Sequence, residues 1–265
     1  MTADPTTSTS TVSITDHDLG SGVAVRTYVP GASATAGLVW AHGGGFVHGD
    51  LDMPEADWVA RTLAGLGIAV VSVDYRLAGG SVHFPIPVDD VVGAWVWATS
   101  AEGPDHALPW SIGGASAGAN LALAAALRLR DGDGAPGDRP GPESVVLVYP
   151  TLHAYQPPGE VGDATDFPPP QILDMYRRYV GSLDDVPPLA TPGEVDPTGL
   201  PRTLVVAAGN DGLRPSAEGF VRALAAAGVG HELDLVETAR HGFLNRPDDE
   251  EAAPAVERIA AWLTA

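Results

Sequence analysis

Short apolar runs alternate with helix-like segments along most of the chain. The run IAVVSVDYR at residues 68–76 is apolar on both faces, which is typical of a strand buried in a parallel sheet. The preceding segment, DWVARTLAGLG at residues 57–67, carries apolar residues at helical spacing. Strands interleaved with helices in this way predict an α/β fold, with a mostly parallel central sheet covered by helices on both faces.

The same alternation divides nearly the whole chain into elements. The predicted strands share a high content of apolar and β-branched residues, and are residues 22–30, 35–42, 68–76, 110–116, 144–150, 203–209 and 231–238. The predicted helices share helical spacing of apolar residues or a high Ala and Leu content, and are residues 57–67, 88–102, 118–131, 170–181, 216–228 and 253–265. We expect a single domain over residues 1–265, with residues 1–11, rich in Thr and Ser, disordered.

One long segment interrupts the alternation. Residues 151–202 are rich in proline and surround one helical run at residues 170–181. The segment is too long for a simple connection, and long connections over an α/β sheet often form lids or binding walls. We therefore expect residues 151–190 to form a small cap insertion.

Composition narrows the choice of chemistry and partners. The chain of 265 residues has a net charge of −20, and all 14 basic residues are arginines, so a nucleic-acid partner is not expected. The absence of cysteine excludes disulfides, thiolate metal sites and a cysteine nucleophile. No apolar run reaches the roughly 18 residues of a membrane span, and the N-terminus lacks the basic and apolar regions of a secretory signal. These features favour a cytoplasmic enzyme.

A small-residue turn at residues 114–118, GASAG, matches the G-x-S-x-G pattern. Such a match arises easily by chance in a chain with 32 glycines. Its position between a predicted strand and a predicted helix is more informative, because a nucleophile there needs small neighbours that let strand and helix approach closely. Ser116 is therefore a candidate nucleophile.

A serine nucleophile needs a general base and an acid that orients the base. Asp211 follows the predicted strand at 203–209, and His241 follows the strand at 231–238. Taken singly, His241 is compatible with an ordinary loop histidine and Asp211 with a turn residue. Together they follow Ser116 in the order Ser, Asp, His, and all three come after carboxyl ends of strands, where ligands bind in α/β sheets.

A glycine-rich loop, AHGGGFVHGD at residues 41–50, supplies candidate donors for a tetrahedral oxyanion. Glycines allow backbone N–H groups to face the substrate without side chains in between, so we assign Gly43, Gly44 and Gly45 to the oxyanion hole, together with the N–H of Ala117. The alternative, a phosphate-binding loop, lacks the required glycine and lysine spacing.

These motifs resemble the bacterial hormone-sensitive-lipase-like esterases of the α/β-hydrolase fold. The resemblance covers about residues 22–263 and rests on HGGGF (42–46), VVSVDYRLA (70–78), FPIPVDDVVGAWVW (84–97), GASAGANLALA (114–124), NDGLRPSAEGF (210–220) and HGF (241–243). It implies a serine carboxylic-ester hydrolase with Ser116 as nucleophile, His241 as base and Asp211 as its orienting acid. The chain departs from the family at Ala115, where an acid is common, and in its short N-terminal segment, which implies a reduced cap.

Five residues on loop or cap segments are candidates for the substrate pocket: Phe46, Phe167, Met175, Tyr176 and Tyr179. Ordinary packing of the cap explains each of them equally well. No histidines show metal-ligand spacing, so we expect no metal, and no motif indicates a cofactor.

The sequence thus predicts hydrolysis of small to medium neutral esters through an acyl-enzyme. A deacetylase or amidase, a lactonase or a thioesterase would use the same residues, including one that serves natural-product metabolism. A non-catalytic ligand-binding protein on the same fold is the alternative from another class. The oligomeric state, monomer or homodimer, stays open.

Overall fold

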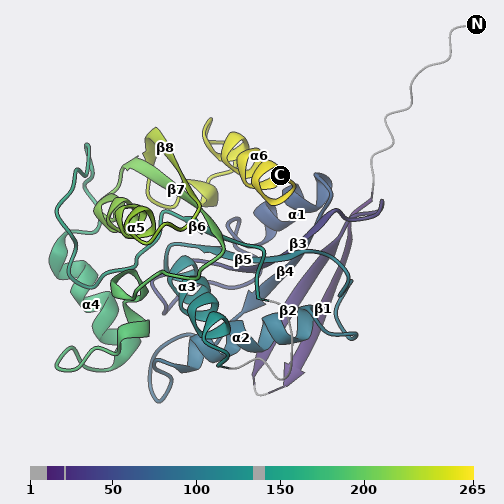
Figure 1. The fold of residues 1–265 in the computed structure, drawn as a ribbon, viewed down its shortest axis with the longest axis horizontal. Coiled ribbons are helices and arrows are strands. Elements are labelled where there is room, and N and C mark those ends of the chain that lie inside the picture. The colour runs from purple at the N-terminus through teal and green to yellow at the C-terminus, as the bar shows by residue number, and fades with distance from the viewer. Residues whose placement is uncertain (1–10, 21, 134–140) are drawn as a thin grey trace, which may run out of the picture.

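The computed structural model describes residues 11–20, 22–133 and 141–265, and within them eight strands form one sheet (Figure 1). The strands are β1 (Ser13–Gly20), β2 (Val23–Val29), β3 (Ala36–Ala41), β4 (Ile68–Asp74), β5 (Trp110–Ala115), β6 (Ser144–Val148), β7 (Arg202–Asn210) and β8 (His231–Arg240). They lie in the order β1-β2-β4-β3-β5-β6-β7-β8. β2 pairs antiparallel with both β1 and β4, whereas the pairs from β4 across to β8 are all parallel.

Helices cover both faces of this sheet (Figure 1). The helices are α1 (Asp57–Gly65), α2 (Ile86–Ala98), α3 (Ala117–Arg130), α4 (Pro169–Val180), α5 (Arg214–Ala226) and α6 (Ala252–Leu263). Buried residues of α1 and α6 form one core with the sheet, and those of α2, α3 and α5 form another on the opposite face. The predicted α/β architecture, with a mostly parallel sheet between two helical layers, is confirmed.

The central strands owe their position to apolar residues on both faces. In β3, Val39 packs into the core with α2 and α3, while its neighbour Trp40 packs into the core with α1 and α6. Successive side chains of a strand point to opposite faces, so a strand between two helical layers must be apolar throughout. Every residue of β3 and of β5 is buried accordingly.

The first strand lies earlier in the chain than expected. The sequence pattern predicts it at residues 22–30, but β1 already begins at Ser13, and β2 is the second strand. No residue of β1 is fully buried, because it is an outer strand that pairs only with β2. Its polar sequence therefore gave no apolar signal. The disorder expected for residues 1–11 falls almost entirely on residues 1–10, which lie outside the described residues.

The segment between β6 and β7 holds α4 and two short 3-10 turns, Pro188–Ala190 and Pro192–Glu194. The buried residues of α4 recur at helical spacing: Ile172, Met175, Tyr176 and Tyr179. The backbone carbonyl of Tyr179 also accepts a hydrogen bond of 2.9 Å from the N–H of Phe84. One face of α4 is thus fixed to the body of the protein. The division into one domain with a cap at 151–190 stays a prediction.

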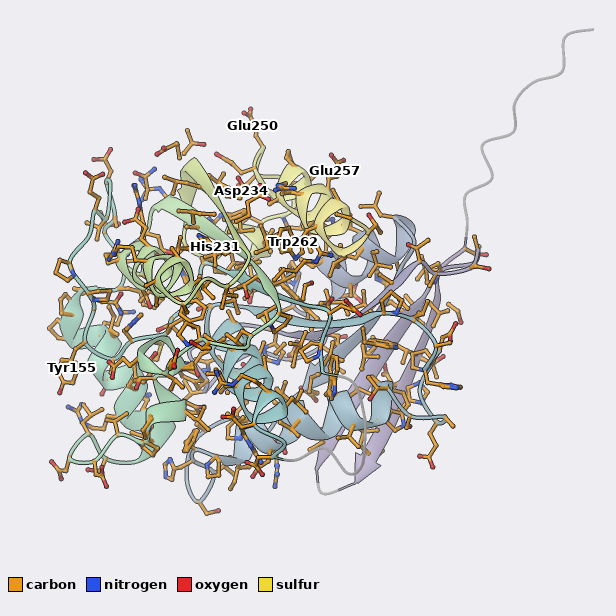
Figure 2. The ribbon with its side chains drawn as sticks, viewed as in Figure 1. Tyr155, His231, Asp234, Glu250, Glu257 and Trp262 are labelled. Carbon is orange, nitrogen blue, oxygen red and sulfur yellow. The ribbon has the colours of Figure 1, made fainter. Side chains whose placement is uncertain are left out.

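Acidic side chains lie on the outer strand β8, in the loop before α6 and on α6 itself (Figure 2). Glu250 and Glu257 are exposed there, and Asp234 is half-buried. Charges on an outer strand discourage pairing with a strand of another molecule. No helix within the described ranges is both long and apolar enough to cross a bilayer.

Candidate active site

Ser116 occupies a sharp turn between β5 and α3. Its backbone angles, φ 53° and ψ −116°, lie in a region that residues with side chains rarely adopt. The flanking glycines make the turn possible: a Cβ on Gly114 would lie 2.5 Å from the Gly118 backbone, and one on Gly118 would collide with the carbonyl oxygens of Ala41 and His42. The small residues of the G-x-S-x-G pattern thus permit a close approach of β5, α3 and the end of β3.

The structure brings the three predicted catalytic residues into one hydrogen-bonded chain. His241 Nε2 lies 2.9 Å from Ser116 Oγ, and His241 Nδ1 lies 2.8 Å from Asp211 Oδ2. Asp211 directly follows β7 and His241 directly follows β8, so adjacent parallel strands deliver both side chains to the turn at Ser116. When Nδ1 donates to Asp211, Nε2 is the atom that accepts the serine proton.

The surroundings of His241 favour its charged form. Burial opposes protonation, but the charge and hydrogen bond of Asp211, together with the charges of Glu55 and Asp166, outweigh it, and the pKa of His241 is raised above its usual value. Asp211 is 1% exposed, and its second oxygen, Oδ1, accepts a hydrogen bond of 2.8 Å from the Leu213 N–H. The acid is therefore fixed in the orientation that the imidazole needs.

Two aromatic rings flank the imidazole. Tyr149 and Phe167 meet it edge-on, with ring centroids 4.9 Å and 4.5 Å from that of His241. Both residues have positive φ angles, 34° and 49°, which non-glycine residues adopt only where the surroundings impose them. Phe167 is one of the pocket residues that the sequence predicts, whereas no sequence motif indicates Tyr149.

The three glycines of the loop at residues 43–45 do not have equal roles. The N–H of Gly43 donates to Glu55 Oε1 at 2.5 Å, so this amide is already engaged. Gly44 and Gly45 line the cavity beside Ser116, and among the described residues none accepts a hydrogen bond from either N–H. The N–H of Ala117, in the first turn of α3, likewise has no partner within its helix. The Gly43 N–H is therefore not free to bind an oxyanion, and the N–H groups of Gly44, Gly45 and Ala117 remain as candidate donors.

The head of the glycine loop is held by aromatic and polar contacts. The His42 ring stacks on Tyr75 at 4.5 Å, and its Nδ1 lies 2.7 Å from the Gly43 carbonyl oxygen. The Tyr75 hydroxyl donates to the His42 carbonyl at 2.9 Å. These contacts brace the glycine loop.

A cavity of about 410 Å³ opens at Ser116 and His241. Residues of the glycine loop, the segment before α1, the cap and the loop after β8 line it: Gly44, Gly45, Val47, His48, Met53, Glu55, Phe167, Gln171, Asp174, Met175, Arg178, Gly242 and Asn245. Helix α4 supplies one wall. A larger cavity of about 810 Å³, beside β1, β2 and α2, contains none of the three candidate catalytic residues, and its buried Asp90 is paired with Arg76. The smaller cavity is therefore the candidate active site.

Only two of the five expected pocket residues, Phe167 and Met175, line this cavity. Phe46, Tyr176 and Tyr179 are fully buried and pack on one another, with Phe46 stacked on Tyr179 at 3.9 Å. This corrects the expectation for these three residues. They lie where α4 contacts the body of the protein, so their role is to pack the cap and not to line the substrate pocket.

The structure also shows site residues that the sequence did not indicate. Glu55, Tyr149 and Asn245 form a hydrogen-bonded group next to His241, and Gln171 and Arg178 line the cavity from α4. Within the described residues, no cluster of three or more His, Asp or Glu side chains is arranged to hold a metal ion.

Comparison with known proteins agrees with this architecture. The family described as alpha/beta hydrolase fold matches residues 38–245. The carboxylic ester hydrolase LipN of Mycobacterium tuberculosis is 34% identical over 235 residues, which cover 84% of this chain and 61% of LipN. The carboxylesterase NlhH of the same species is 34% identical over 219 residues, covering 78% of this chain and 66% of NlhH. This chain thus spans less than two thirds of the length of either relative.

A solved structure provides a comparison in three dimensions. An esterase from Pyrobaculum calidifontis is 32% identical, with a TM-score of 0.82 over 96% of this chain and 84% of the esterase. The likeness therefore includes the arrangement of the sheet and its helices.

Proposed function

The chain belongs to the alpha/beta hydrolase fold family, and from this premise we propose that it is a serine carboxylic-ester hydrolase. The observation that carries the proposal is the chain of hydrogen bonds from Ser116 through His241 to Asp211, which opens onto the cavity. The two mycobacterial relatives are named a carboxylic ester hydrolase and a carboxylesterase, which supports an ester bond as the bond that is cleaved.

The geometry supports a two-step reaction. Ser116 Oγ attacks the ester carbonyl carbon while His241 Nε2 takes the hydroxyl proton, and the negative charge that forms on the carbonyl oxygen is stabilised by the N–H groups of Gly44, Gly45 and Ala117. His241 returns the proton to the departing alcohol, which leaves an acyl group on Ser116. Water, deprotonated by His241, then attacks the acyl carbon; the bond to Ser116 Oγ breaks, His241 returns the proton to that oxygen, and the acid leaves.

The cavity favours small to medium neutral esters as substrates. A volume of about 410 Å³ lies in the lower part of the range for small-molecule sites, and Phe167 and Met175 give its wall apolar surface. The carboxylate of Asp174 and the guanidinium of Arg178 bind each other at 2.9 Å, so neither side chain offers an unpaired charge to a substrate. A cytoplasmic location stays a prediction.

Amides, lactones and thioesters would react through the same residues, and a non-catalytic binding protein would keep the same fold. The test is a panel of p-nitrophenyl acetate, butyrate and octanoate, with the matching anilides and thioesters, for the wild type and Ser116→Ala. We expect the esters to be cleaved fastest and the variant to lose roughly 10⁶-fold in kcat while keeping its fold by circular dichroism. Faster cleavage of the anilides, or ester hydrolysis retained in Ser116→Ala, would contradict the proposal.

A further inference from the structure

Glu55 is a buried carboxylate with an unusual set of partners. It is 1% exposed, and within the described residues it forms no ion pair with an arginine, in contrast to buried Asp90, which pairs with Arg76. Three donors surround it instead. Gly43 donates its N–H to Oε1, while the Tyr149 hydroxyl and, at 3.1 Å, the Asn245 side-chain amide donate to Oε2.

These three donors belong to the three loops that form the candidate active site. Gly43 lies in the glycine loop at residues 41–50, which is the proposed oxyanion loop. Tyr149, directly after β6, packs its ring against that of His241. Asn245 ends the short 3-10 turn that follows His241, and its side-chain oxygen also accepts the backbone N–H of Glu55 at 3.2 Å. The Glu55 side chain thus connects the oxyanion loop to Tyr149, which packs on the His241 ring, and to Asn245, in the turn that follows His241.

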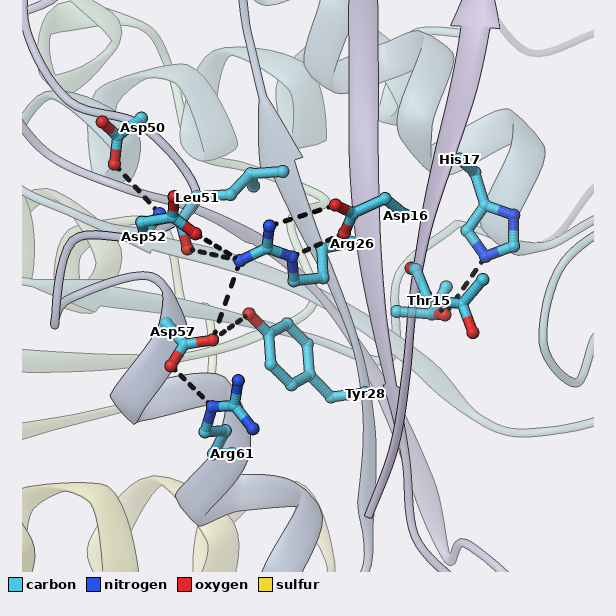
Figure 3. A network of polar contacts seen from close by, with 11 residues as sticks. Thr15, Asp16, His17, Arg26, Tyr28, Asp50, Leu51, Asp52, Asp57 and Arg61 are labelled. Atoms are coloured by element: carbon cyan, nitrogen blue, oxygen red, sulfur yellow. Dashed lines mark hydrogen bonds and ion pairs between the residues drawn. The ribbon is translucent and has the colours of Figure 1, made fainter.

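The backbone around Glu55 is itself held firmly. The indole N–H of Trp40 donates to the Glu55 carbonyl at 2.9 Å. On the outer side, Arg26 of β2 binds Asp16 of β1, the Leu51 carbonyl and Asp52, and lies 3.8 Å from Asp57 (Figure 3). The segment that carries Glu55 is therefore held by side chains of both β2 and β3.

The partners of Glu55 are those of an ionised carboxylate. All three are donors, and a carboxylate accepts hydrogen bonds without offering any. Burial raises the pKa of Glu55 above its ordinary value, while the hydrogen bonds from Tyr149, Gly43 and Asn245 and the charge of His241 act in the opposite direction and stabilise the charged form. The negative charge lies close enough to His241 to help raise the pKa of the imidazole.

We propose that Glu55 is a positioning residue of the ester hydrolase, which fixes the oxyanion loop through Gly43 and stabilises the His241 imidazolium with a second buried negative charge. The inference rests on the proposed function. It gives Glu55 two separable effects, one that depends on where its carboxylate lies and one that depends on its charge.

The test is Glu55→Gln, which keeps the shape and removes the charge. We expect kcat to fall about 10- to 100-fold, less than the roughly 10²- to 10³-fold loss when an oxyanion donor is removed outright, with a smaller change in KM. Without the negative charge the pKa of His241 falls, so the acid limb of kcat/KM against pH moves to lower pH. A merely structural role would not move this midpoint.

Two further variants separate charge from position. Glu55→Asp keeps the negative charge but shortens the side chain by one methylene, which moves the carboxylate away from Gly43. We expect kcat to fall while the midpoint of the acid limb stays near that of the wild type. This variant also provides the test if Glu55→Gln does not fold. Asp57→Asn is the matched control, since Asp57 bonds Arg61 and the Tyr28 hydroxyl and contacts none of the three donors of Glu55 (Figure 3). This control lowers the melting temperature and leaves the pH midpoint unchanged.

An unchanged midpoint in folded Glu55→Gln, or a kcat within twofold of the wild type in either Glu55 variant, would overturn the inference. Failure of the proposed function gives a different result, because the wild type itself would then not hydrolyse esters, or Ser116→Ala would remain active.

Discussion

At the scale of single residues, Ser116 and its two flanking glycines illustrate how the site is built. Ser116 adopts φ 53°, a conformation that costs free energy for a residue with a side chain. Gly114 and Gly118 allow β5 and α3 to enclose this turn so tightly that neither could carry a Cβ without displacing backbone. The conformation directs the serine hydroxyl to His241 rather than into the surrounding core.

The pH dependence of activity should report the charge of Asp211. His241 acts as a base only when neutral, so kcat/KM falls as the pH drops through its pKa, which lies above the ordinary value of about 6.5. In Asp211→Asn the negative charge is lost and the pKa falls. We therefore expect the midpoint of the acid limb to move to lower pH, and kcat to fall by as much as roughly 10⁴-fold, as when a serine protease triad loses its aspartate.

A suitable control for this measurement is Asp249→Asn. Asp249 pairs with Arg246 in the loop after His241 and does not touch the imidazole. Its pH profile should match that of the wild type. An Asp211→Asn profile with the wild-type midpoint would contradict the assignment of Asp211 as the partner of the base.

Sequence reasoning identified residues with a motif or a position after a strand, and missed those defined by contacts. Ser116, Asp211 and His241 were predicted because each follows a strand in a recognisable order, and the structure places them within hydrogen-bonding distance. Glu55 lies in a short turn before α1, where an acid is normally solvated. Its burial depends on Tyr149 and Asn245, which are 94 and 190 residues away along the chain.

At the scale of elements, α4 shows how one helix can serve both packing and the cavity. Tyr176 and Tyr179 lie on the face that packs against the body, while Gln171, Asp174 and Arg178 line the cavity with Met175. A helical pattern shows which residues share a face, but not whether that face meets a core or a substrate. For this reason the helical pattern predicts α4 correctly, but it does not distinguish the residues of α4 that line the cavity from those that pack against the body of the protein.

Shortening Met175 should change the preference for acyl-chain length. Met175→Ala removes apolar volume from the cavity wall, so the ratio of kcat/KM for the octanoate ester to that for the acetate ester should rise about tenfold. Leu173→Ala is the matched control, since Leu173 lies on the same helix and packs on the core without lining the cavity. Equal ratios in both variants would show that α4 is not a substrate wall.

The outer strand β1 marks the limit of prediction from hydrophobic pattern at this scale. Buried strands such as β3 and β5 were located to within one or two residues because the two helical layers require them to be apolar. β1 has a single neighbour and no fully buried residue, and ion pairs such as Asp16 with Arg26 tie it to β2. Polar contacts of this kind leave no periodic signal in the sequence.

At the scale of the whole molecule, the topology of the sheet assembles the site from distant parts of the chain. The glycine loop, Ser116, Tyr149, Asp211 and His241 follow β3, β5, β6, β7 and β8, which are successive parallel neighbours. The carboxyl ends of parallel strands lie at the same edge of the sheet, so the parallel arrangement alone brings these five loops together. The acidic surface, with its net charge of −20, concerns solubility and association rather than this chemistry.

The central claim is that Ser116 is a nucleophile activated by His241, and covalent labelling tests it most directly. The folded protein is treated with a fluorophosphonate and the adduct is located by mass spectrometry, with Ser116→Ala and His241→Asn as controls. We predict one adduct, on Ser116, that is absent in Ser116→Ala and forms far more slowly in His241→Asn. A folded wild type that stays unlabelled at Ser116, or labelling at the wild-type rate without His241, would contradict the account.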